Sequence, residues 1–355
     1  MREYSVRALV YHVSSEKIKM GINFLEDAAT RLTSLRDELK SEFNILSTRF
    51  VLPIREWDKE LGKLAKVVRD NGVDFIAVPL KEPKSVSVLE LLSTDPGVFT
   101  SIPYVQEKER EILNVIREIP EKIDWIATSR FGVAFGERLT TPYFPVTASN
   151  EEGVSISLLY VNYLGNRSCE GKKLSKIVDE TINDVIREVA QGMRAIKWNT
   201  SIIGVDPSLS PWMEESVAAF IERQTRVTFG LPGTFSKIRE INEELSEVSE
   251  RITGYNEVMI PLAEDNRLKE LAKLGSLRFR DLIHLVASCV VGLDMVYIPS
   301  STSDDILRGV LRDLNSIQRL KRRSLGLRIG LVGAEPGEEI QLGRFGNVPV
   351  IEPID

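Results

Sequence analysis

Short runs rich in β-branched residues alternate along this chain with longer segments in which apolar residues recur every three or four positions. Runs of the first kind are typical of buried strands, and segments of the second kind are typical of helices with one apolar face. The expected strands cover residues 4–13, 44–53, 74–80, 124–129, 154–163, 201–206, 294–299 and 326–333. The expected helices cover residues 15–41, 57–71, 106–118, 171–198, 211–224, 235–252, 266–273, 279–292 and 304–322. The alternation predicts an α/β fold, layered or barrel-like.

No shift in composition marks a linker between domains. The 355 residues are therefore expected to form a single domain, residues 1–355. Residues 80–105 contain three prolines, Pro83, Pro96 and Pro103, and are predicted to form a long loop outside the core.

Two helix ends carry clear signals. Ser210 followed by Pro211 is typical of an N-cap and a first helical residue, so a helix is expected to begin there. The basic cluster at residues 319–323 follows an apolar-periodic segment. We interpret it as the positive last turn of a helix, favoured by the helix dipole, rather than as a phosphate-binding site.

Charge and hydropathy exclude several classes of protein. The formal net charge is -6, with 46 basic residues spread among 52 acidic ones, which argues against nucleic acid as a partner. No apolar run reaches the roughly 20 residues that cross a bilayer, and no signal peptide is recognisable, so no membrane partner and a cytoplasmic location are expected.

Cysteine and histidine are scarce, with two of each in the chain. Cys169 lies in a polar segment and Cys289 in an apolar one, which argues against a disulfide between them. Two cysteines and two histidines are too few to indicate a classical zinc site, and no metal site is expected. No dinucleotide fingerprint, P-loop or nucleophile elbow occurs, so the sequence indicates no particular cofactor.

One glycine-rich loop, residues 129–148, follows an expected strand. Its Gly132 would allow a ligand to approach the backbone, and Arg130 would hold a carboxylate or phosphate through its planar guanidinium. The alternative is a tight turn with an arginine on its rim.

Three further loops carry acidic side chains near the ends of apolar runs. Asp206 and Ser208 follow one expected strand, Glu264 and Asp265 follow a short apolar run, and Asp294 opens another strand. These carboxylates are candidates for an acid and base pair or a site for a hard cation, and equally for helix caps.

Cys289 lies in the most apolar segment of the chain, residues 285–299. His284 precedes it by five residues, which places the two side chains about 140° apart on a helix, so they do not face each other. Cys289 is therefore either a small packing residue or a reactive thiol without a histidine partner.

Several segments together resemble the UPF0210/DUF711 family of uncharacterised prokaryotic proteins. The resemblance covers most of the chain and is densest in five segments of its C-terminal half. They are GVDPSLSPWMEESVAAFIE, FGLPGTFSKIREI, TGYNEVMIPLAEDNRLKELA, DLIHLVASCVVGLDMVYIPSSTSDDIL and GRFGNVPVIE. The resemblance implies a fold like that of pyruvate formate-lyase and ribonucleotide reductase, a single α/β barrel of about ten strands with helices outside and a loop through its centre.

The resemblance also bears on chemistry. In the radical enzymes of that fold a cysteine on the central loop carries a thiyl radical, and Cys289 would take that role. The tail, Arg344 to Asn347, departs from the glycyl-radical motif, so glycyl-radical chemistry is not expected.

The combined expectation is a protein that binds a small polar metabolite at the mouth of the barrel. The pocket is expected to contain Arg130, Gly132, Ser208, Gly233, Thr234, Asp265, Gly292 and Asp294. If the protein is an enzyme, Asp206 or Glu264 would act as base, and Cys289 would line the site or act as nucleophile. The alternative is a non-catalytic ligand sensor or assembly protein. The resemblance further implies a homo-oligomer.

Overall fold

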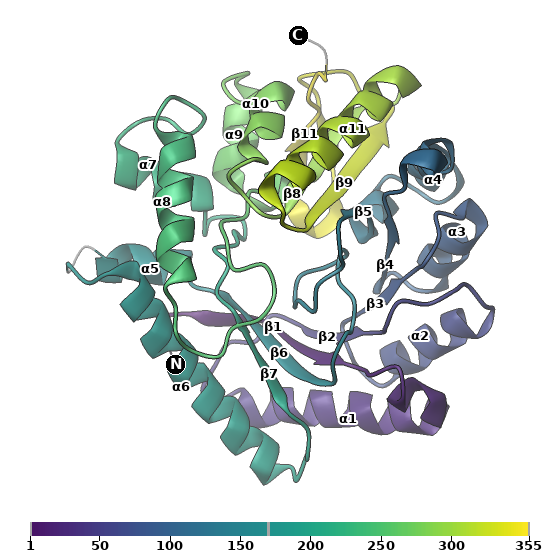
Figure 1. Cartoon of the computed structure of the whole chain (residues 1–355), viewed down its shortest axis with the longest axis vertical. Coiled ribbons are helices and arrows are strands. Elements are labelled where there is room, and N and C mark those ends of the chain that lie inside the picture. The colour runs from purple at the N-terminus through teal and green to yellow at the C-terminus, as the bar shows by residue number, and fades with distance from the viewer. Residues whose placement is uncertain (1, 169–170, 354–355) are drawn as a thin grey trace.

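A nine-stranded sheet forms the centre of the molecule in the computed structural model, which describes residues 2–168 and 171–353 (Figure 1). The order across the sheet is β7-β6-β1-β2-β3-β4-β5-β9-β8. The strands are β1 (Ser5–His12), β2 (Thr48–Val51), β3 (Phe75–Pro79), β4 (Val98–Pro103), β5 (Phe131–Phe135), β6 (Gly153–Leu159), β7 (Ile202–Asp206), β8 (Gly292–Pro299) and β9 (Leu325–Val332). The expected α/β class is confirmed.

Helices cover the outer side of the sheet. Strands β1 to β5 run parallel, and each connection between them crosses over through a helix, α1, α2, α3 or α4. The α-helices are α1 (Ile22–Leu39), α2 (Glu60–Asp70), α3 (Ser85–Thr94), α4 (Glu109–Lys122), α5 (Val161–Ser168), α6 (Leu174–Ala195), α7 (Val217–Thr225), α8 (Thr234–Ser246), α9 (Asn266–Lys273), α10 (Phe279–Leu285) and α11 (Asp304–Lys321).

The apolar face of each long helix explains why it lies against the sheet. In α1 the buried residues include Leu25, Leu32, Leu35 and Leu39, which recur at the three-to-four-residue spacing of a helix face. Figure 1 shows α1 to α4, α6 and α11 around the outside of a strongly curved sheet, which leaves its concave side to be filled by loops.

The concave side of the sheet is lined by small and aromatic residues. Ala8, Val10, Val51 and Ala77 form one buried cluster with Phe99 there, and Phe144 joins this cluster from the loop at residues 136–152, between β5 and β6. Small side chains on the strands leave room for this central loop, which packs inside the curve of the sheet.

The two edges of the sheet are linked by loops rather than by strand pairing. Val205 at the β7 edge bridges Ile252, and farther along the same segment the carbonyl of Val258 accepts a hydrogen bond from Val290, just before β8. The structure thus shows a curved nine-stranded sheet, whereas the expected closed barrel of ten strands is not shown.

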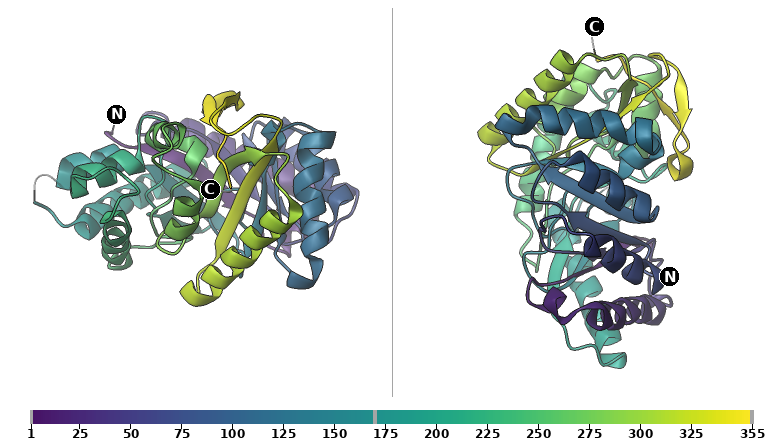
Figure 2. Two further views of the ribbon diagram at one scale, coloured as in Figure 1. Left: turned by 90° about the horizontal axis from the view of Figure 1, so that it is seen from above. Right: turned by 90° about the vertical axis from the view of Figure 1, so that its right-hand side faces the viewer.

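A small hairpin stands apart from the main sheet. It consists of β10 (Glu339–Gln341) and β11 (Asn347–Pro349), joined by the 3₁₀ helix η5 (Gly343–Phe345), and it continues into Val350, which bridges Tyr297 of β8 (Figure 2). This hairpin brings Arg344, near the end of the sequence, to the same side of the sheet as the beginning of β1.

Several expectations about secondary structure are wrong, and the helix expected at residues 279–292, for example, ends at Leu285. Residues 80–105 are not a loop, because they contain α3 and β4. Pro83 and Pro96 lie between elements, and Pro103 ends β4, so the prolines mark boundaries. Residues 124–129 form no strand but lead into the 3₁₀ helix η3 (Ile126–Arg130), which begins where the Asp124 carboxylate accepts a hydrogen bond from Ala127.

Another error concerns the start of α7. Ser210 is not its N-cap, because the helix begins six residues later. Ser216 is the cap, and its hydroxyl accepts a hydrogen bond from the backbone N–H of Ala219 at 2.9 Å. By contrast, the basic residues Arg319 and Lys321 do lie in the last turn of α11, as predicted.

Two further findings concern the chain as a whole. Among the residues described, no helix is both long and apolar enough to span a membrane. Cys169, one of the two cysteines considered in the sequence, lies outside the described residues.

Candidate functional site

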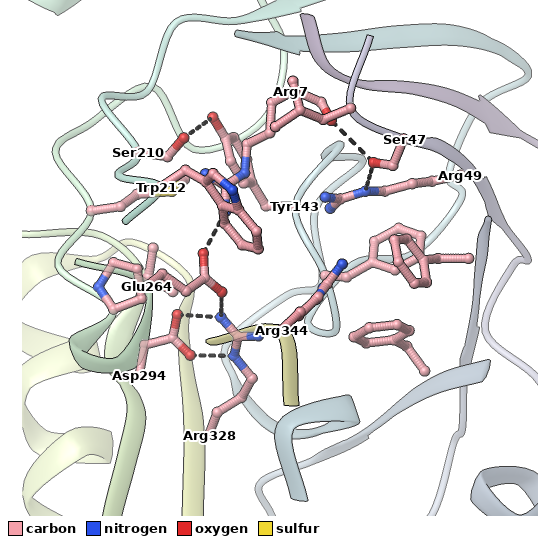
Figure 3. A pocket seen from close by; sticks show the side chains of 17 residues that line it. Arg7, Ser47, Arg49, Tyr143, Ser210, Trp212, Glu264, Asp294, Arg328 and Arg344 are labelled. Carbon is pink, nitrogen blue, oxygen red and sulfur yellow. Dashed lines mark hydrogen bonds and ion pairs between the residues drawn. The ribbon is translucent and has the colours of Figure 1, made fainter. Parts of the chain in front are cut away.

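A cavity of about 290 Å³ lies on the concave side of the sheet, near the residues at which β1 to β4 begin (Figure 3). Six charged residues line it, namely Arg7, Arg49, Arg328, Arg344, Glu264 and Asp294. Five aromatic residues line it as well, namely Phe75, Phe99, Tyr143, Phe144 and Trp212. Four positive charges against two negative charges leave the lining with a surplus of two positive charges.

A β-bulge places Arg7 in the cavity. Where β1 pairs with β6, Val6 lies opposite Leu158 and Ala8 lies opposite Ser157, so Arg7 is an extra residue without a partner. A bulge of this kind redirects a side chain that regular alternation would send elsewhere. The Arg7 guanidinium is therefore buried in the cavity and does not project among the outer helices.

A second bulge places Asp294. Between Leu293 and Val296, strand β8 has two residues where β9 has one, and the residue opposite is Arg328. Met295 takes the left-handed conformation, with φ at 55°, which is uncommon outside glycine and costs energy. This conformation turns the Asp294 carboxylate toward Arg328.

A chain of buried ion pairs runs across one side of the cavity. Arg328 forms a two-pronged pair with Asp294, in which Nη2 lies 2.7 Å from Oδ2, and the same Nη2 donates to Glu264 at 3.0 Å. Glu264 also pairs with Arg7 through its other oxygen. Each carboxylate thus has a buried guanidinium as its partner, which offsets the cost of removing the charges from water.

The two carboxylates respond differently to this network. Burial works to raise the pKa of Glu264, but the charges of Arg7 and Arg328 outweigh it, so the pKa of Glu264 lies below its usual value. Burial raises the pKa of Asp294, although Arg328 opposes the rise. Glu264 is accordingly held as a carboxylate between two arginines.

Arg49 differs from the arginines in that network because no carboxylate pairs with it among the residues described. Its side chain donates to the Ser47 hydroxyl at 3.0 Å and to the Pro142 carbonyl at 3.1 Å, and the residue is only 9% exposed. Burial lowers the pKa of Arg49, and repulsion from Arg7 and Arg344 lowers it further. Without a ligand, the positive charge of Arg49 therefore destabilises the folded protein.

Aromatic rings form the wall beside Arg49. Phe75 and Phe99 meet edge to face with 5.4 Å between ring centroids, and Phe99 meets Phe144 in the same manner at 5.5 Å. The Arg49 guanidinium lies 5.2 Å from the Phe144 ring, and that of Arg344 lies 4.7 Å from the Phe75 ring. One side of the cavity is thus apolar and cationic, whereas the other is ionic.

Of the site residues expected from the sequence, Glu264 and Asp294 are the two that line this cavity. Asp206 and Ser208 lie together elsewhere, fully buried. The Asp206 carboxylate accepts hydrogen bonds from the Thr141 hydroxyl at 3.1 Å and from the Tyr255 backbone at 2.8 Å. Asp206 thus ties the central loop to the segment after residue 252.

Asp265 and Arg130 bind other parts of the chain. Asp265 is the N-cap of α9, and its carboxylate accepts from the backbone N–H of Arg267 at 2.9 Å. The Arg130 guanidinium donates to the carbonyls of Leu92 and Val98, at 2.9 and 3.0 Å.

The expected glycines lie where the backbone is crowded or turns. A Cβ on Gly132 would lie 2.8 Å from Pro145 and Val146 of the central loop, and one on Gly292 would meet the Gly326 carbonyl. Gly233 takes a positive φ at the start of α8, and Thr234 is the first residue of that helix.

Cys289 is fully buried and does not line the cavity. Burial raises the pKa of its thiol to about 12. Its backbone carbonyl accepts a hydrogen bond from Lys321 at the end of α11.

No group of three or more histidine, cysteine or acidic side chains suited to a metal ion occurs in the described part of the chain. The cavity is dominated by guanidinium groups, which bind anions.

The arginines of the cavity are not among the residues predicted from the sequence, although three of them have a recognisable sequence context. Arg7, Arg49 and Arg328 each interrupt an otherwise apolar strand, in VRALVYH, TRFV and LGLRIGLV. An arginine in a strand that is buried on both faces is costly unless it binds something. The bulge at Arg7 and the approach of Arg344 from the hairpin have no such signal.

Comparisons with a family model and with curated proteins point to the same family. A family model described as "Uncharacterised ACR (DUF711)" matches residues 84–343. Glu264, Asp294 and Arg328 lie within the matched residues, whereas Arg7 and Arg49 precede them.

Several curated proteins are similar to this chain. A UPF0210 protein of Thermoanaerobacter is 27% identical over 210 residues, which cover 56% of this chain and 46% of that protein. A UPF0210 protein of Halothermothrix orenii is 31% identical over 156 residues, covering 42% and 34%, respectively. A third, from Methanospirillum hungatei, is 25% identical over 188 residues, covering 51% and 41%. The chain covers less than half the length of each of these relatives.

Proposed function

The chain belongs to the DUF711 family of uncharacterised proteins, and from the geometry of its central cavity we propose that it binds a small organic anion there. The observation that carries the proposal is Arg49, a buried cation at the cavity wall without a carboxylate partner among the described residues. A buried charge of this kind is tolerated where a ligand supplies the opposite charge.

Unused hydrogen-bond donors around the cavity support the same proposal. Arg49 donates through Nε and Nη1, and its Nη2 makes no hydrogen bond among the described residues. The Nε of Arg7 is buried without an acceptor in the same part of the chain. The guanidinium of Arg344 lies over aromatic rings and forms no hydrogen bond or ion pair with the residues that the structure describes. Figure 3 shows the guanidinium groups of Arg49 and Arg344 turned toward the middle of the cavity.

The surplus of two positive charges decides the sign of the ligand. A carboxylate or a phosphate ester would lower the repulsion among Arg7, Arg49 and Arg344, and a cation would increase it. A planar guanidinium also matches the two oxygens of a carboxylate or phosphate geometrically. We therefore favour an acidic metabolite over an amine.

Binding of this anion is the step that an enzyme and a ligand sensor would share. The sequence-based role of Cys289, self-association and a cytoplasmic location stay predictions. A relationship to the pyruvate formate-lyase barrel is likewise a proposal, supported by the strong curvature of the sheet and by the central loop inside it.

Thermal unfolding in the presence of small anions tests the proposed function. We expect inorganic phosphate, succinate and benzoate, each at millimolar concentration, to include at least one anion that raises the melting temperature of the wild-type protein. Arg49→Met should abolish that rise, because it removes the unpaired cation. The matched control is Arg239→Met, which removes an exposed arginine paired with Glu243 on α8 and should leave the rise intact. Equal rises in both variants would overturn the proposal.

A further inference from the structure

Resting on the proposed function, we infer that the ligand carries its anionic group on a flat aromatic body, which packs against the wall formed by Phe75, Phe99 and Phe144. These rings meet edge to face and line the cavity beside Arg49. A ring added to such an array gains edge-to-face or stacked contacts that an aliphatic chain does not make.

The position of Arg49 relative to the aromatic residues fixes how the anionic group of the ligand is joined to its aromatic body. The Arg49 guanidinium lies 5.2 Å from the Phe144 ring centroid and 5.9 Å from that of Phe75. An anion held by Arg49 therefore has these rings directly beside it. A carboxylate or phosphate attached to a ring, or one atom away from it, places both parts correctly.

The remaining polar groups of the cavity argue against a body rich in hydroxyl groups. The Ser47 hydroxyl donates to the Arg7 carbonyl and accepts from Arg49, and the Ser210 hydroxyl is bonded to that of Tyr143 at 3.1 Å. Glu264 and Asp294 already bind arginines. A sugar would have to break these contacts, whereas an apolar ring leaves them unchanged.

The size of the cavity limits the body further. Its volume of about 290 Å³ lies just below the range of roughly 300–1,000 Å³ that is typical of small-molecule sites. Arg344 and Leu46, both lining residues, are exposed to solvent and mark where the cavity opens. A single aromatic ring with one anionic group fits this space.

Three matched probes separate the two parts of the ligand. Benzoate carries both the ring and the anion, acetate carries the anion without the ring, and benzyl alcohol carries the ring with a neutral hydroxyl group in place of the anion. Isothermal titration calorimetry on the wild-type chain should show that benzoate binds at least about tenfold more tightly than acetate, and more tightly than benzyl alcohol. Arg49→Met should weaken the binding of both anions and leave the affinity for benzyl alcohol unchanged.

A variant of the aromatic wall assigns the preference to its residues. Phe75→Leu should reduce the ratio of benzoate to acetate affinity by about threefold or more, because it removes one ring contact. The control is Phe235→Leu, which alters a partly buried ring stacked on His284, in a different part of the fold, and should leave the ratio unchanged.

The possible outcomes distinguish this inference from the proposed function. Equal affinity for benzoate and acetate, both lost in Arg49→Met, would overturn the aromatic body and leave the anion site standing. Binding of benzyl alcohol alone, or of no probe, would overturn the aromatic body, and the thermal shifts with phosphate and succinate would then decide whether the anion site stands. The ratio of benzoate to acetate affinity in the wild-type protein tests the aromatic body even if Phe75→Leu fails to fold.

Discussion

Two kinds of buried arginine meet in the cavity, and they differ in what balances their charge. Arg328 holds Asp294 and Glu264 together, so its charge is compensated within the protein. Arg49 has carbonyl and hydroxyl acceptors but no carboxylate partner in the described chain. The same type of side chain is therefore structural in one position and available for a ligand in the other.

This difference predicts that one substitution changes stability by unequal amounts at the two positions. Arg328→Met should lower the free energy of unfolding by about 3–5 kcal/mol, because two buried carboxylates lose their shared partner. Arg49→Met should change it by less than about 1 kcal/mol, because it removes an uncompensated charge together with two modest hydrogen bonds. Urea denaturation of both variants measures the difference. Equal losses would show that the Arg49 charge is already balanced in the folded protein.

Cys289 provides a second prediction for a single residue. Its thiol is fully buried and its pKa is raised to about 12, so almost no thiolate exists near neutral pH. Iodoacetamide should leave Cys289 unmodified in the folded protein and should modify it in urea, as followed by mass spectrometry of the peptide that contains it. Rapid modification of the folded protein would instead support a role as nucleophile.

Among the residues of the cavity, the acidic ones could be predicted from the sequence more readily than the arginines. Glu264 and Asp294 were identified because they end or begin apolar runs, where loops meet strands. Arg7 and Arg328 are part of the strands themselves, and their direction depends on bulges in β1 and β8. A one-residue register shift of this kind is decided by three-dimensional packing and leaves no local trace in the sequence.

Among the structural elements, the central loop depends on Asp206. Its carboxylate at the end of β7 accepts from Thr141 of that loop and from the backbone of Ser208, Tyr255 and Asn256. Asp206 is thus a junction between three segments that surround the cavity.

Asp206→Asn should therefore reduce stability. The amide group would turn an N–H donor toward backbone donors, and we expect a loss of about 2–3 kcal/mol in the free energy of unfolding. Asp27→Asn, which changes an exposed carboxylate paired with Arg31 on α1, is the control and should cost little. An unchanged melting temperature combined with weaker anion binding would support the sequence-based role of Asp206 in contacting the ligand.

The beginning of the chain is tied to α6 by Arg2. Its guanidinium lies 2.6 Å from Asp184 and 3.1 Å from Glu188, and 2.9 Å from Glu42, which follows α1. The hydrogen bond from Arg2 holds the pKa of Asp184 below its usual value.

This network predicts a stability difference that depends on pH. A carboxylate with a lowered pKa stabilises the fold above its ordinary pKa of about 4, and the contribution is lost as the pH falls through the lowered value. Arg2→Met should thus cost about 1 kcal/mol at neutral pH, and the difference from wild type should vanish well below pH 4. Chemical denaturation at several pH values measures it. A loss that persists unchanged in strong acid would indicate that packing by the Arg2 side chain matters more than its charge.

The periodicity of the sequence located most helices and strands, and its errors have physical causes. The three prolines of residues 80–105 predict a loop, yet they flank α3 and end β4. Residues 124–129 have the apolar composition of a strand, but a 3₁₀ helix forms there, and at its start the Asp124 carboxylate accepts a hydrogen bond from the backbone N–H of Ala127. In both segments a local hydrogen bond or boundary residue decided the structure.

For the whole molecule, the order of the strands in the sheet determines which residues meet in the cavity. The parallel block β1 to β5 is extended by β6 and β7 at one edge and by β9 and β8 at the other. Residues from positions 7 to 344 of the sequence meet in one cavity because both edges curve toward the central loop. The α/β class followed from the alternation of runs, whereas this long-range order could not be read from local patterns.

Both proposals for the cavity depend on whether it binds an organic anion through Arg49. A crystal of the protein soaked with 4-bromobenzoate tests this binding, because the anomalous signal of bromine marks the position of the ligand. We expect a bromine peak inside the cavity, with the carboxylate within hydrogen-bonding distance of Arg49 and the ring against Phe75 and Phe99. An empty cavity, with bromine peaks only at the surface of the protein, would contradict it.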